Sequence, residues 1–469
     1  MIAMEPENGV AAELSHLVPN GTVLNDGPSL EKYSHDEAQW APFAAPLAVV
    51  LARTTQEVAA VVRYAGERGI HVVPRGAGTG LSGGANSMEN SIVISLELMT
   101  AIREINSADG FAVAEAGVIN DSLRQTVAAQ GLWYPPDPAS YKTSTIGGNA
   151  ATNAGGICCV KYGVTRDYVL GLTVVLADGE IAHLGRRTAK GVTGYDLTSL
   201  MIGSEGTLGI ITEVTVKLLP LSGREDRAII GYFPSLRAAG HAIAAVKAAG
   251  IVPSALELID STCLRAVDNW LHLGLPENVN VMLLASVDEP GSTGELLANR
   301  LASIFLTHGG SHIEQATDPK KTEKLFLARR MAYPALERLG QILTEDICVP
   351  RSAVPDMLSR IEASAAKYDV VIANIAHAGD GNLHPQIIVP HGDVASKARA
   401  KLAFDEIVTD CRLLGGTVTG EHGVGLLKLS GAAAELGQRV IDMHQSVKNA
   451  LDPNGTLNPG KAFPHTHRN

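Results

Sequence analysis

The chain has 469 residues, which is long enough for two or three domains that each bury a core of their own. Lys and Arg number 38 against 49 Asp and Glu, and the net charge of −11 argues against a nucleic-acid partner. The five cysteines are odd in number and form no C-x-x-C pair, which favours reduced thiols over disulfides or a thiolate zinc site. The 48 glycines are the one unusual feature of the composition.

No apolar run reaches the roughly 18 residues that a membrane-spanning helix needs, and the first 20 residues lack a basic segment followed by an apolar one. We therefore expect a cytoplasmic protein with no transmembrane segment, and peripheral association with a membrane stays open.

Strands and helices alternate up to about residue 220. We expect a strand at 48–51, a helix that Thr54 caps and Gly69 ends, and a buried strand at 70–73. Further strands are expected at 92–96, 112–116, 169–176 and 209–217. From about residue 223 onward, strands and helices follow one another in a β-α-β pattern that contains no glycine clusters. We divide the chain into an N-terminal helical segment (1–45), a first α/β domain (46–222), a second domain (223–415) and a C-terminal segment (416–469).

The first glycine cluster spans residues 74–84 and contains G-x-G-x-x-G at Gly78, Gly80 and Gly83. A dinucleotide fingerprint of the Rossmann type needs a helix that begins there, whereas the next predicted element is the strand 92–96. We therefore reject a Rossmann fold. Consecutive glycines can still direct backbone N–H groups at a phosphate, and the alternative is a plain glycine-rich turn.

Two further glycine clusters lie at residues 146–156 and 203–209. The loop at 146–156 carries Asn and Thr but no charge, so it can approach a flat polar ligand closely and hydrogen-bond to its edge. Three such loops in one α/β domain favour a large nucleotide as the ligand.

A predicted hairpin at residues 370–389 places two histidines together. With Asp380 and Gly381 as a two-residue type I′ turn, His377 and His384 are directly opposed and can reach one metal ion. The alternative is a pair of half-buried histidines with ordinary partners. A fourth glycine cluster at 415–425 contains Glu421 and His422, and Glu421 is a candidate acidic ligand.

The first three glycine clusters, together with the run Asn458-Pro459-Gly460-Lys461, resemble the FAD-binding domain of the vanillyl-alcohol-oxidase (PCMH-type) flavoproteins. Residues 30–463 resemble the FAD-dependent D-2-hydroxyacid dehydrogenases, which include the FAD subunit of glycolate oxidase, D-lactate dehydrogenase and D-2-hydroxyglutarate dehydrogenase. The resemblance implies an α+β fold with a PCMH-type FAD-binding domain of two subdomains. A ferredoxin-like α+β substrate (cap) domain follows, and the C-terminal segment returns to the flavin.

The resemblance implies FAD as the cofactor. Some relatives attach the flavin covalently through a histidine where this chain has Thr79, so we expect FAD to be bound non-covalently. The residues implied to bind it are Pro74, Arg75, Gly76, Ala77, Gly78, Thr79, Gly80, Gly83, Gly84, Pro136, Asp137, Ser140, Gly147, Gly148, Asn149, Thr152, Asn153, Gly155, Gly156, Glu205, Gly206, Ile211 and Asn458.

The resemblance also implies that His377, His384 and Glu421 bind a divalent metal and that His422 is the catalytic base. Two histidines and one carboxylate fit Zn²⁺, and Mn²⁺ or Fe²⁺ would accept the same ligands.

By the same resemblance Arg329 binds the substrate carboxylate, with Tyr333 nearby and Arg330 as the alternative arginine. Thr344 stands where the hydroxyglutarate enzymes have a lysine for a second carboxylate. This favours D-lactate or glycolate over D-2-hydroxyglutarate.

Two other functions compete with this one. One is an oxygen-using alcohol or sugar-lactone oxidase of the same fold, which would not need the two hairpin histidines. The other is a flavoprotein subunit of a larger complex. Such a subunit would be either non-catalytic or the FAD subunit of a multi-subunit glycolate oxidase. The electron acceptor can be a quinone, a cytochrome or an electron-transfer flavoprotein, and companion subunits or a homodimer are both open.

Overall fold

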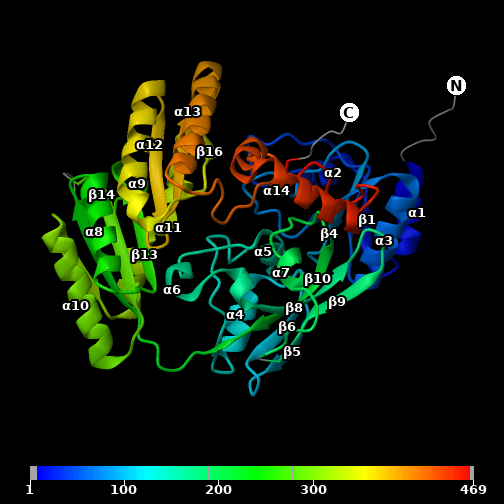
Figure 1. Ribbon diagram of the computed structural model, residues 1–469, viewed down its shortest axis with the longest axis horizontal. Coiled ribbons are helices and arrows are strands. Elements are labelled where there is room, and N and C mark those ends of the chain that lie inside the picture. Colours follow the sequence, from blue (N-terminus) through cyan, green and yellow to red (C-terminus); the bar gives the residue numbers. More distant parts are fainter. Residues whose placement is uncertain (1–7, 189, 277–278, 465–469) are drawn as a thin grey trace. The chain divides into compact units, whose positions relative to one another are not determined.

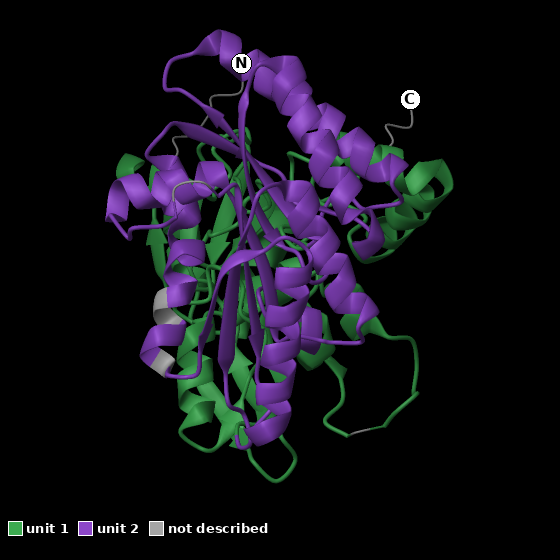
Figure 2. Cartoon of the chain, turned by 90° about the vertical axis from the view of Figure 1, so that its left-hand side faces the viewer, with its two compact units in different colours: residues 1–155, 164–221, 421–469 green, residues 156–163, 222–420 purple. Residues whose placement is uncertain are grey.

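The computed structural model describes residues 8–188, 190–276 and 279–464. The chain divides into two compact units (Figure 2). Unit 1 consists of Met1–Gly155, Val164–Leu221 and Glu421–Asn469, and unit 2 consists of Gly156–Gly163 and Ser222–Gly420. The short segment Gly156–Gly163 therefore packs with unit 2, although unit 1 contains the residues on either side of it.

Unit 1 contains two main sheets and one short strand pair. In the first sheet β2, β4 and β3 are parallel, and β1 is antiparallel to β2. The second sheet is antiparallel throughout. The strands, in sheet order, are β1 (Thr22–Leu24), β2 (Ala48–Leu51), β4 (Ser91–Ser95) and β3 (His71–Arg75); β5 (Ile102–Asn106), β6 (Phe111–Glu115), β10 (Ile210–Lys217), β8 (Val169–Val175) and β9 (Ile181–Gly185); and the pair β11 (Leu219–Pro220) and β7 (Leu132–Trp133).

The helices of unit 1 are α1 (Asn8–Leu17), α2 (Gly27–Tyr33), α3 (Thr55–Arg68), α4 (Asn120–Ala128), α5 (Ile146–Thr152), α7 (Leu197–Met201) and α14 (Leu429–Leu451), with a 3₁₀ turn at Thr165–Tyr168. The predicted caps of α3 are confirmed. Thr54 accepts a hydrogen bond from the Glu57 N–H, and Gly69 ends the helix with a left-handed φ of 64°. Val58, Val61 and Val62 of this helix pack with strands β2 and β4 into one buried apolar cluster.

Unit 2 is built on one sheet in which every adjacent pair of strands is antiparallel. Its strands, in sheet order, are β15 (Ser311–Ala316), β12 (Arg227–Phe233), β14 (Val281–Val287), β13 (Ala255–Asp260), β18 (Val371–His377), β19 (Asn382–Val389) and β16 (Gln341–Thr344), and β17 (Ile347–Cys348) also pairs with β19.

Helices cover this sheet (Figure 1). They are α6 (Cys159–Tyr162), α8 (Leu236–Ala248), α9 (Ser261–Leu271), α10 (Gly291–Thr307), α11 (Pro319–Glu337), α12 (Val354–Tyr368) and α13 (Val394–Leu413), with a 3₁₀ turn at Arg351–Ala353. Helices α9 and α11 share an apolar cluster with Ile259 of β13 and Ile375 of β18. Alternate residues of a strand point to opposite faces, so Glu257 and His377 lie on the face that α9 and α11 cover.

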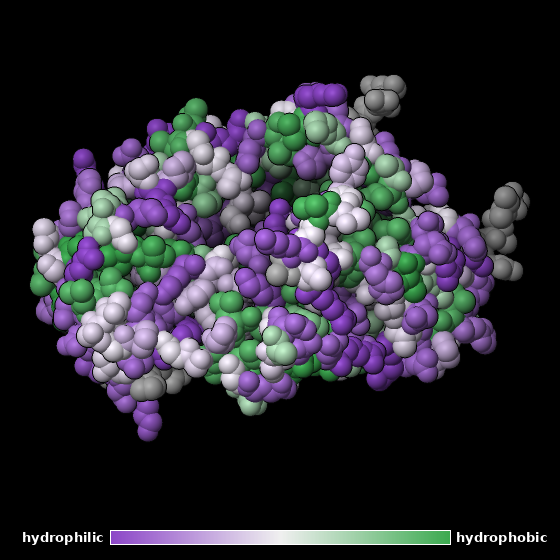
Figure 3. Space-filling model, turned by 60° about the horizontal axis from the view of Figure 1, so that its bottom comes forward, coloured by the Kyte–Doolittle hydropathy of each residue, from purple (hydrophilic) through white to green (hydrophobic). Residues whose placement is uncertain are grey.

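The strands expected up to residue 220 are present as β2, β3, β4, β6, β8 and β10, but within residues 71–115, all of them described, β3 to β6 follow one another without a helix between them, so strict alternation is not observed. Within the described residues, no helix has the length and apolar character needed to cross a membrane. On the face drawn in Figure 3, hydrophilic and hydrophobic residues are interspersed.

Candidate active site

The first glycine cluster follows strand β3 in unit 1, and no helix begins in it, as the sequence predicts. In the part of the chain that the structure describes, no backbone N–H of residues 76–84 donates a hydrogen bond to another protein group. Most backbone N–H groups in proteins have such a partner, so this loop offers a row of donors to a ligand. Arg75 lies against the loop, where its guanidinium donates to the His35 carbonyl at 2.7 Å.

The second cluster differs from the expected loop, because residues Ile146–Thr152 form the short helix α5. The Thr145 hydroxyl caps this helix by accepting from the Gly148 N–H at 3.1 Å. A Cβ atom on Gly76 would lie 2.5 Å from Thr145 Oγ1, so only glycine lets the first loop approach the start of α5 this closely. The first two clusters are therefore in contact.

Asn120, which the sequence analysis missed, joins the predicted residues around Pro136 to the second cluster. Its side-chain amide donates to the Pro136 carbonyl at 3.2 Å and to Asn149 Oδ1 at 2.9 Å. Asp137 and Ser140 follow in the segment that leads to α5. The Asn149 side chain is buried and already has a protein partner.

The third cluster packs against the first in the same way. A Cβ atom on Gly206 would lie 2.3 Å from Pro74 Cγ, and Asn458 Nδ2 donates to the carbonyls of both Gly84 (2.9 Å) and Glu205 (2.7 Å). Asn458 is fully buried, and its side-chain oxygen accepts from Lys461 Nζ at 2.7 Å. The amide of Asn458 therefore holds protein loops together.

Burial lowers the pKa of the Lys461 ammonium to about 7, although the charges of Asp36 and Glu205 raise it. Burial raises the pKa of Glu205, and hydrogen bonds from the N–H groups of Val424 and Gly425 oppose that shift. Neither shift follows from a local sequence pattern.

The other predicted cofactor residues lie in or beside these clusters. Thr152 Oγ1 donates to the Gly148 carbonyl, Asn153 Oδ1 accepts from the Arg166 N–H, and Ile211 is buried in β10. Gly156 is the first residue of the segment that belongs to unit 2. Gly155 remains in unit 1, where a Cβ atom would lie 2.3 Å from a carboxylate oxygen of Glu421.

In unit 2 a buried acid joins two predicted site residues. Glu257 Oε1 lies 2.8 Å from His377 Nδ1, and Glu257 Oε2 accepts from Arg329 Nε at 2.8 Å. Burial raises the pKa of Glu257, but the attraction of His377 and Arg329 outweighs burial and leaves this pKa below its usual value. An ionised carboxylate can only accept, so His377 Nδ1 carries a proton in this contact.

Sequence reasoning missed Glu257. The available signal was an acid within the otherwise apolar run Ala255–Ile259, because a charge in a buried strand needs a partner.

The predicted register of the histidine hairpin is wrong. His377 pairs with Asn382 and Ile375 pairs with His384, so four residues rather than two form the turn. A type I′ turn needs positive φ at both central residues, and only Gly381 has one (91°). The shift is by two positions, which keeps both histidines on one face, and their ring centroids lie 5.1 Å apart with the planes at 88°.

Asp346 lies beside His384 and is fully buried. One of its carboxylate oxygens lies 3.5 Å from His384 Nδ1. The other oxygen accepts from Thr419 Oγ1 at 2.8 Å and from the Gly420 N–H at 3.0 Å. Asp346 thus fixes the end of unit 2 immediately before Glu421.

Glu421 and His422 begin the last segment of unit 1. Their side chains are 12% and 16% exposed, and Glu421 Oε1 lies 3.9 Å from His422 Nε2. Of the two candidate arginines, Arg329 is 9% exposed and bound to Glu257, whereas Arg330 is exposed. Tyr333 is partly buried and packs against the apolar cluster of α9 and α11.

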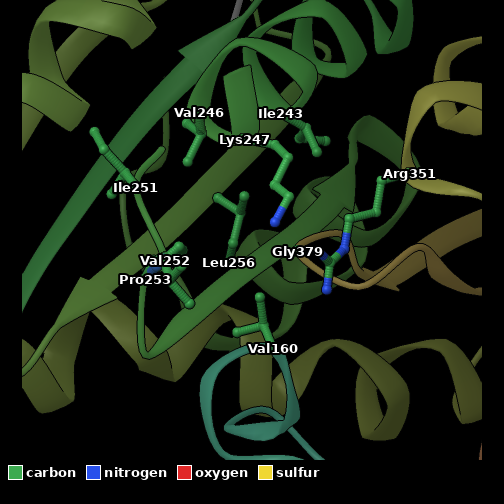
Figure 4. A pocket seen from close by; sticks show the side chains of 10 residues that line it. All are labelled: Val160, Ile243, Val246, Lys247, Ile251, Val252, Pro253, Leu256, Arg351 and Gly379. Atoms are coloured by element: carbon green, nitrogen blue, oxygen red, sulfur yellow. The ribbon is translucent and has the colours of Figure 1, made fainter. Parts of the chain in front are cut away.

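Unit 2 also contains a pocket of about 230 Å³, next to the opposite face of β13 (Figure 4). Apolar side chains such as Ile243 and Leu256 form most of its walls, and Lys247 and Arg351 are its cations. Among the residues that line it there is no acid or histidine that could transfer a proton.

Comparison with known families identifies the family to which the chain belongs. Residues 46–185 match the family model of an FAD-binding domain, and residues 224–462 match the model of the C-terminal domain of FAD-linked oxidases. The chain belongs to the FAD-linked oxidases. This family binds FAD, and the first two glycine clusters, the first of which has the open N–H groups, lie within the matched FAD-binding domain.

Relatives within the family are similar over nearly the whole chain. Glycolate oxidase subunit GlcD of Bacillus subtilis is 40% identical over 89% of both chains. D-lactate dehydrogenase of Anaerostipes hadrus is 36% identical over 96% of both chains. The predicted membership of an FAD-dependent oxidoreductase family is confirmed.

Solved structures confirm the PCMH-type fold of this FAD-linked oxidase. The 4-ethylphenol oxidase from Gulosibacter chungangensis superimposes with a TM-score of 0.80 at 18% identity, covering 99% of this chain and 98% of that one. p-Cresol methylhydroxylase gives a TM-score of 0.79 at 17% identity, covering 98% of each chain.

Proposed function

We propose that this FAD-linked oxidase oxidises a D-2-hydroxy acid to the 2-oxo acid, with D-lactate or glycolate as the favoured substrate. The observation that carries the proposal is the buried set of Glu257, Arg329 and His377 beside His384 in unit 2. An arginine and two histidines in one buried site fit a substrate with a carboxylate and an adjacent hydroxyl. Relatives named glycolate oxidase subunit and D-lactate dehydrogenase support the same class.

The donor set also fits a divalent metal. Glu257 fixes the tautomer of His377 through Nδ1, as carboxylates do for histidines that bind a metal through Nε2. We infer that His377, His384 and Glu421 hold the metal, and this set of two imidazoles and one carboxylate suits Zn²⁺, with Mn²⁺ or Fe²⁺ as alternatives. The bound metal would lower the pKa of the substrate hydroxyl.

The residues of the chain then have distinct tasks. Arg329 binds the substrate carboxylate through its guanidinium N–H groups, and His422 accepts the proton of the hydroxyl group as the C–H bond breaks. Bound FAD, held non-covalently, supplies the acceptor for the hydride that leaves the α-carbon. The products are the 2-oxo acid, one proton on His422 and the reduced cofactor, so atoms and electrons balance.

Thr344 supports a monocarboxylate. Its hydroxyl donates to Gln386 Oε1 at 2.7 Å, and both side chains are buried and neutral. A second carboxylate would find no cation at this position. D-2-hydroxyglutarate, which has a second carboxylate, is therefore the less favoured, alternative substrate.

The reduced cofactor would pass its electrons to a quinone, a cytochrome or an electron-transfer flavoprotein, directly or through companion subunits.

The test is the absorbance of the flavin under anaerobic conditions. D-lactate, glycolate and D-2-hydroxyglutarate are added separately to the purified holoenzyme, before and after treatment with a chelator. We expect bleaching by a monocarboxylate, loss of bleaching after chelation and recovery on adding Zn²⁺. No bleaching with any of the acids would contradict the dehydrogenase proposal. Bleaching that persists after treatment with the chelator would contradict the proposed requirement for a metal.

A further inference from the structure

The carboxylate of Glu205 has partners that none of the predicted roles explains. Oε1 accepts a hydrogen bond from the Val424 N–H at 2.7 Å, and Oε2 accepts one from the Gly425 N–H at 2.8 Å. Glu205 is buried, with 7% exposure. Both oxygens are thus bound to the loop that follows His422, and the expected contact of Glu205 with the cofactor stays a prediction.

The backbone of Glu205 is constrained as well. Its φ is 53°, in the left-handed region, which is unfavourable for a residue other than glycine. The Glu205 N–H donates to the Ala151 carbonyl at 2.8 Å, and the Glu205 carbonyl accepts from Asn458 Nδ2 at 2.7 Å. Such a conformation persists where the surroundings fix it, and here three separate segments of unit 1 do so.

The loop that carries His422 has a second attachment. Ser82, in the first glycine cluster, donates through its hydroxyl to the His422 carbonyl at 3.1 Å. The Ser82 carbonyl accepts from the Leu426 N–H at 2.8 Å. Residues 422–426 are therefore bound on one side to the first glycine cluster and on the other to the third.

We propose that Glu205 is a positioning residue, whose carboxylate holds the backbone of residues 422–425 against the glycine clusters and so fixes His422 relative to the bound cofactor. The inference rests on the proposed function, in which His422 accepts the substrate proton. Proton transfer needs hydrogen-bond distance to the donor, so a loop displaced by about 1 Å would slow the reaction strongly.

The decisive variant is Glu205→Gln, which keeps the shape of the side chain. One oxygen can still accept an N–H, but the new amide group would point its own N–H at the second backbone donor. We expect kcat to fall about 10–100-fold while KM and the FAD content of the purified protein stay within about twofold.

Glu57→Gln is the matched control. Glu57 is also a buried acid of unit 1, and its carboxylate accepts the N–H groups of Asn20 (2.7 Å), Gly21 (3.1 Å) and Arg53 (2.8 Å), none of which lies in a glycine cluster. We expect a similar loss of stability with unchanged kcat. Equal losses of kcat in both variants, or a wild-type kcat in Glu205→Gln, would overturn the proposal.

A readout without turnover separates this inference from the proposed function. Hydrogen exchange of the Val424 and Gly425 amides in the holoenzyme should accelerate in Glu205→Gln and stay unchanged in Glu57→Gln. If Glu205→Gln does not yield holoenzyme, Ser82→Ala removes the side-chain hydrogen bond of the other attachment, keeps the bond from the Leu426 N–H to the carbonyl of residue 82, and should lower kcat by about 3–10-fold. Failure of the wild type to reduce its flavin would contradict the function, whereas unchanged exchange in Glu205→Gln would contradict the attachment.

Discussion

Glu257 and His377 lie 120 positions apart in the chain, yet the Glu257 carboxylate accepts the Nδ1 proton of His377 at a distance of 2.8 Å. Arg329 binds the other oxygen of the same carboxylate. One buried acid therefore orients both a proposed metal ligand and the proposed substrate arginine.

Glu257→Gln should weaken metal binding. The glutamine amide cannot accept from both His377 and Arg329, so the imidazole loses its fixed tautomer and orientation. Such partners of metal ligands are typically worth 10–100-fold in metal affinity. We expect a loss of that size in the Zn²⁺ affinity of the metal-free protein, measured by competition with a chromophoric chelator.

Asp260→Asn provides the control in the same strand. Asp260 is also buried, and its carboxylate accepts from the N–H groups of Cys263 and Asn374 rather than from a histidine. This variant should lower stability and leave Zn²⁺ affinity unchanged. An equal loss of affinity in both variants would mean that Glu257 acts only through the stability of the sheet.

Arg329 and Arg330 should differ in their effect on substrate binding. A charge-assisted pair with a carboxylate contributes about 1.5–3 kcal/mol, so Arg329→Ala should raise the KM for the hydroxy acid by about 10–100-fold. Arg329→Lys keeps the charge but lacks the planar guanidinium, so its KM should lie between those of the wild type and Arg329→Ala. Arg330 is exposed, and Arg330→Ala should leave KM unchanged. A larger effect at Arg330 would reverse the assignment.

Asp288 should be a major determinant of the stability of unit 2. Its side chain is 1% exposed and accepts from Lys161, Tyr162 and Arg224, so it ties the segment Gly156–Gly163 to the sheet. Replacing one partner of a buried ionic network leaves uncompensated charge. Asp288→Asn should therefore cost about 3 kcal/mol in the free energy of unfolding, measured with urea.

Glu289→Gln is the control for this network. Glu289 binds Lys161 at 2.7 Å but is 27% exposed, so its removal should cost less than about 1 kcal/mol because solvent screens the pair. Equal losses at the two positions would contradict the assignment of Asp288.

Lys461 should give stability a characteristic dependence on pH. Its folded pKa is about 7 against an ordinary value of 10.5, so between these values the unfolded chain binds a proton that the folded protein does not. The contribution of this group to the free energy of unfolding therefore rises as pH increases from 7 towards 10.5 and is lowest below pH 7. Lys461→Met removes the titrating group.

The measurement compares slopes, because Lys461→Met also loses hydrogen bonds at every pH. Urea unfolding of the holoenzymes at pH 7 and pH 9.5 should show a smaller increase in stability for the variant than for the wild type. Equal increases in the free energy of unfolding of the wild type and the variant would place the titration of Lys461 outside this pH range.

The sequence by itself determined the features that depend on neighbouring residues. Glycine spacing and the absence of a helix after Gly84 excluded a Rossmann loop, and strand periodicity put His377 and His384 on one face. The resemblance of several ordered motifs identified the family, which the matches to the two FAD-linked domains confirm.

The tertiary structure decided what depends on residues far apart in the chain. The hairpin takes a four-residue turn because its backbone is also bound from outside: the Gly379 N–H donates to the Leu256 carbonyl, and the Gly381 carbonyl accepts the Val349 N–H. Glu257 and Glu205 gain their roles from partners 120 and 219 positions away. A buried charge must find its hydrogen bonds within the fold, and a local sequence pattern does not specify which distant segment supplies them.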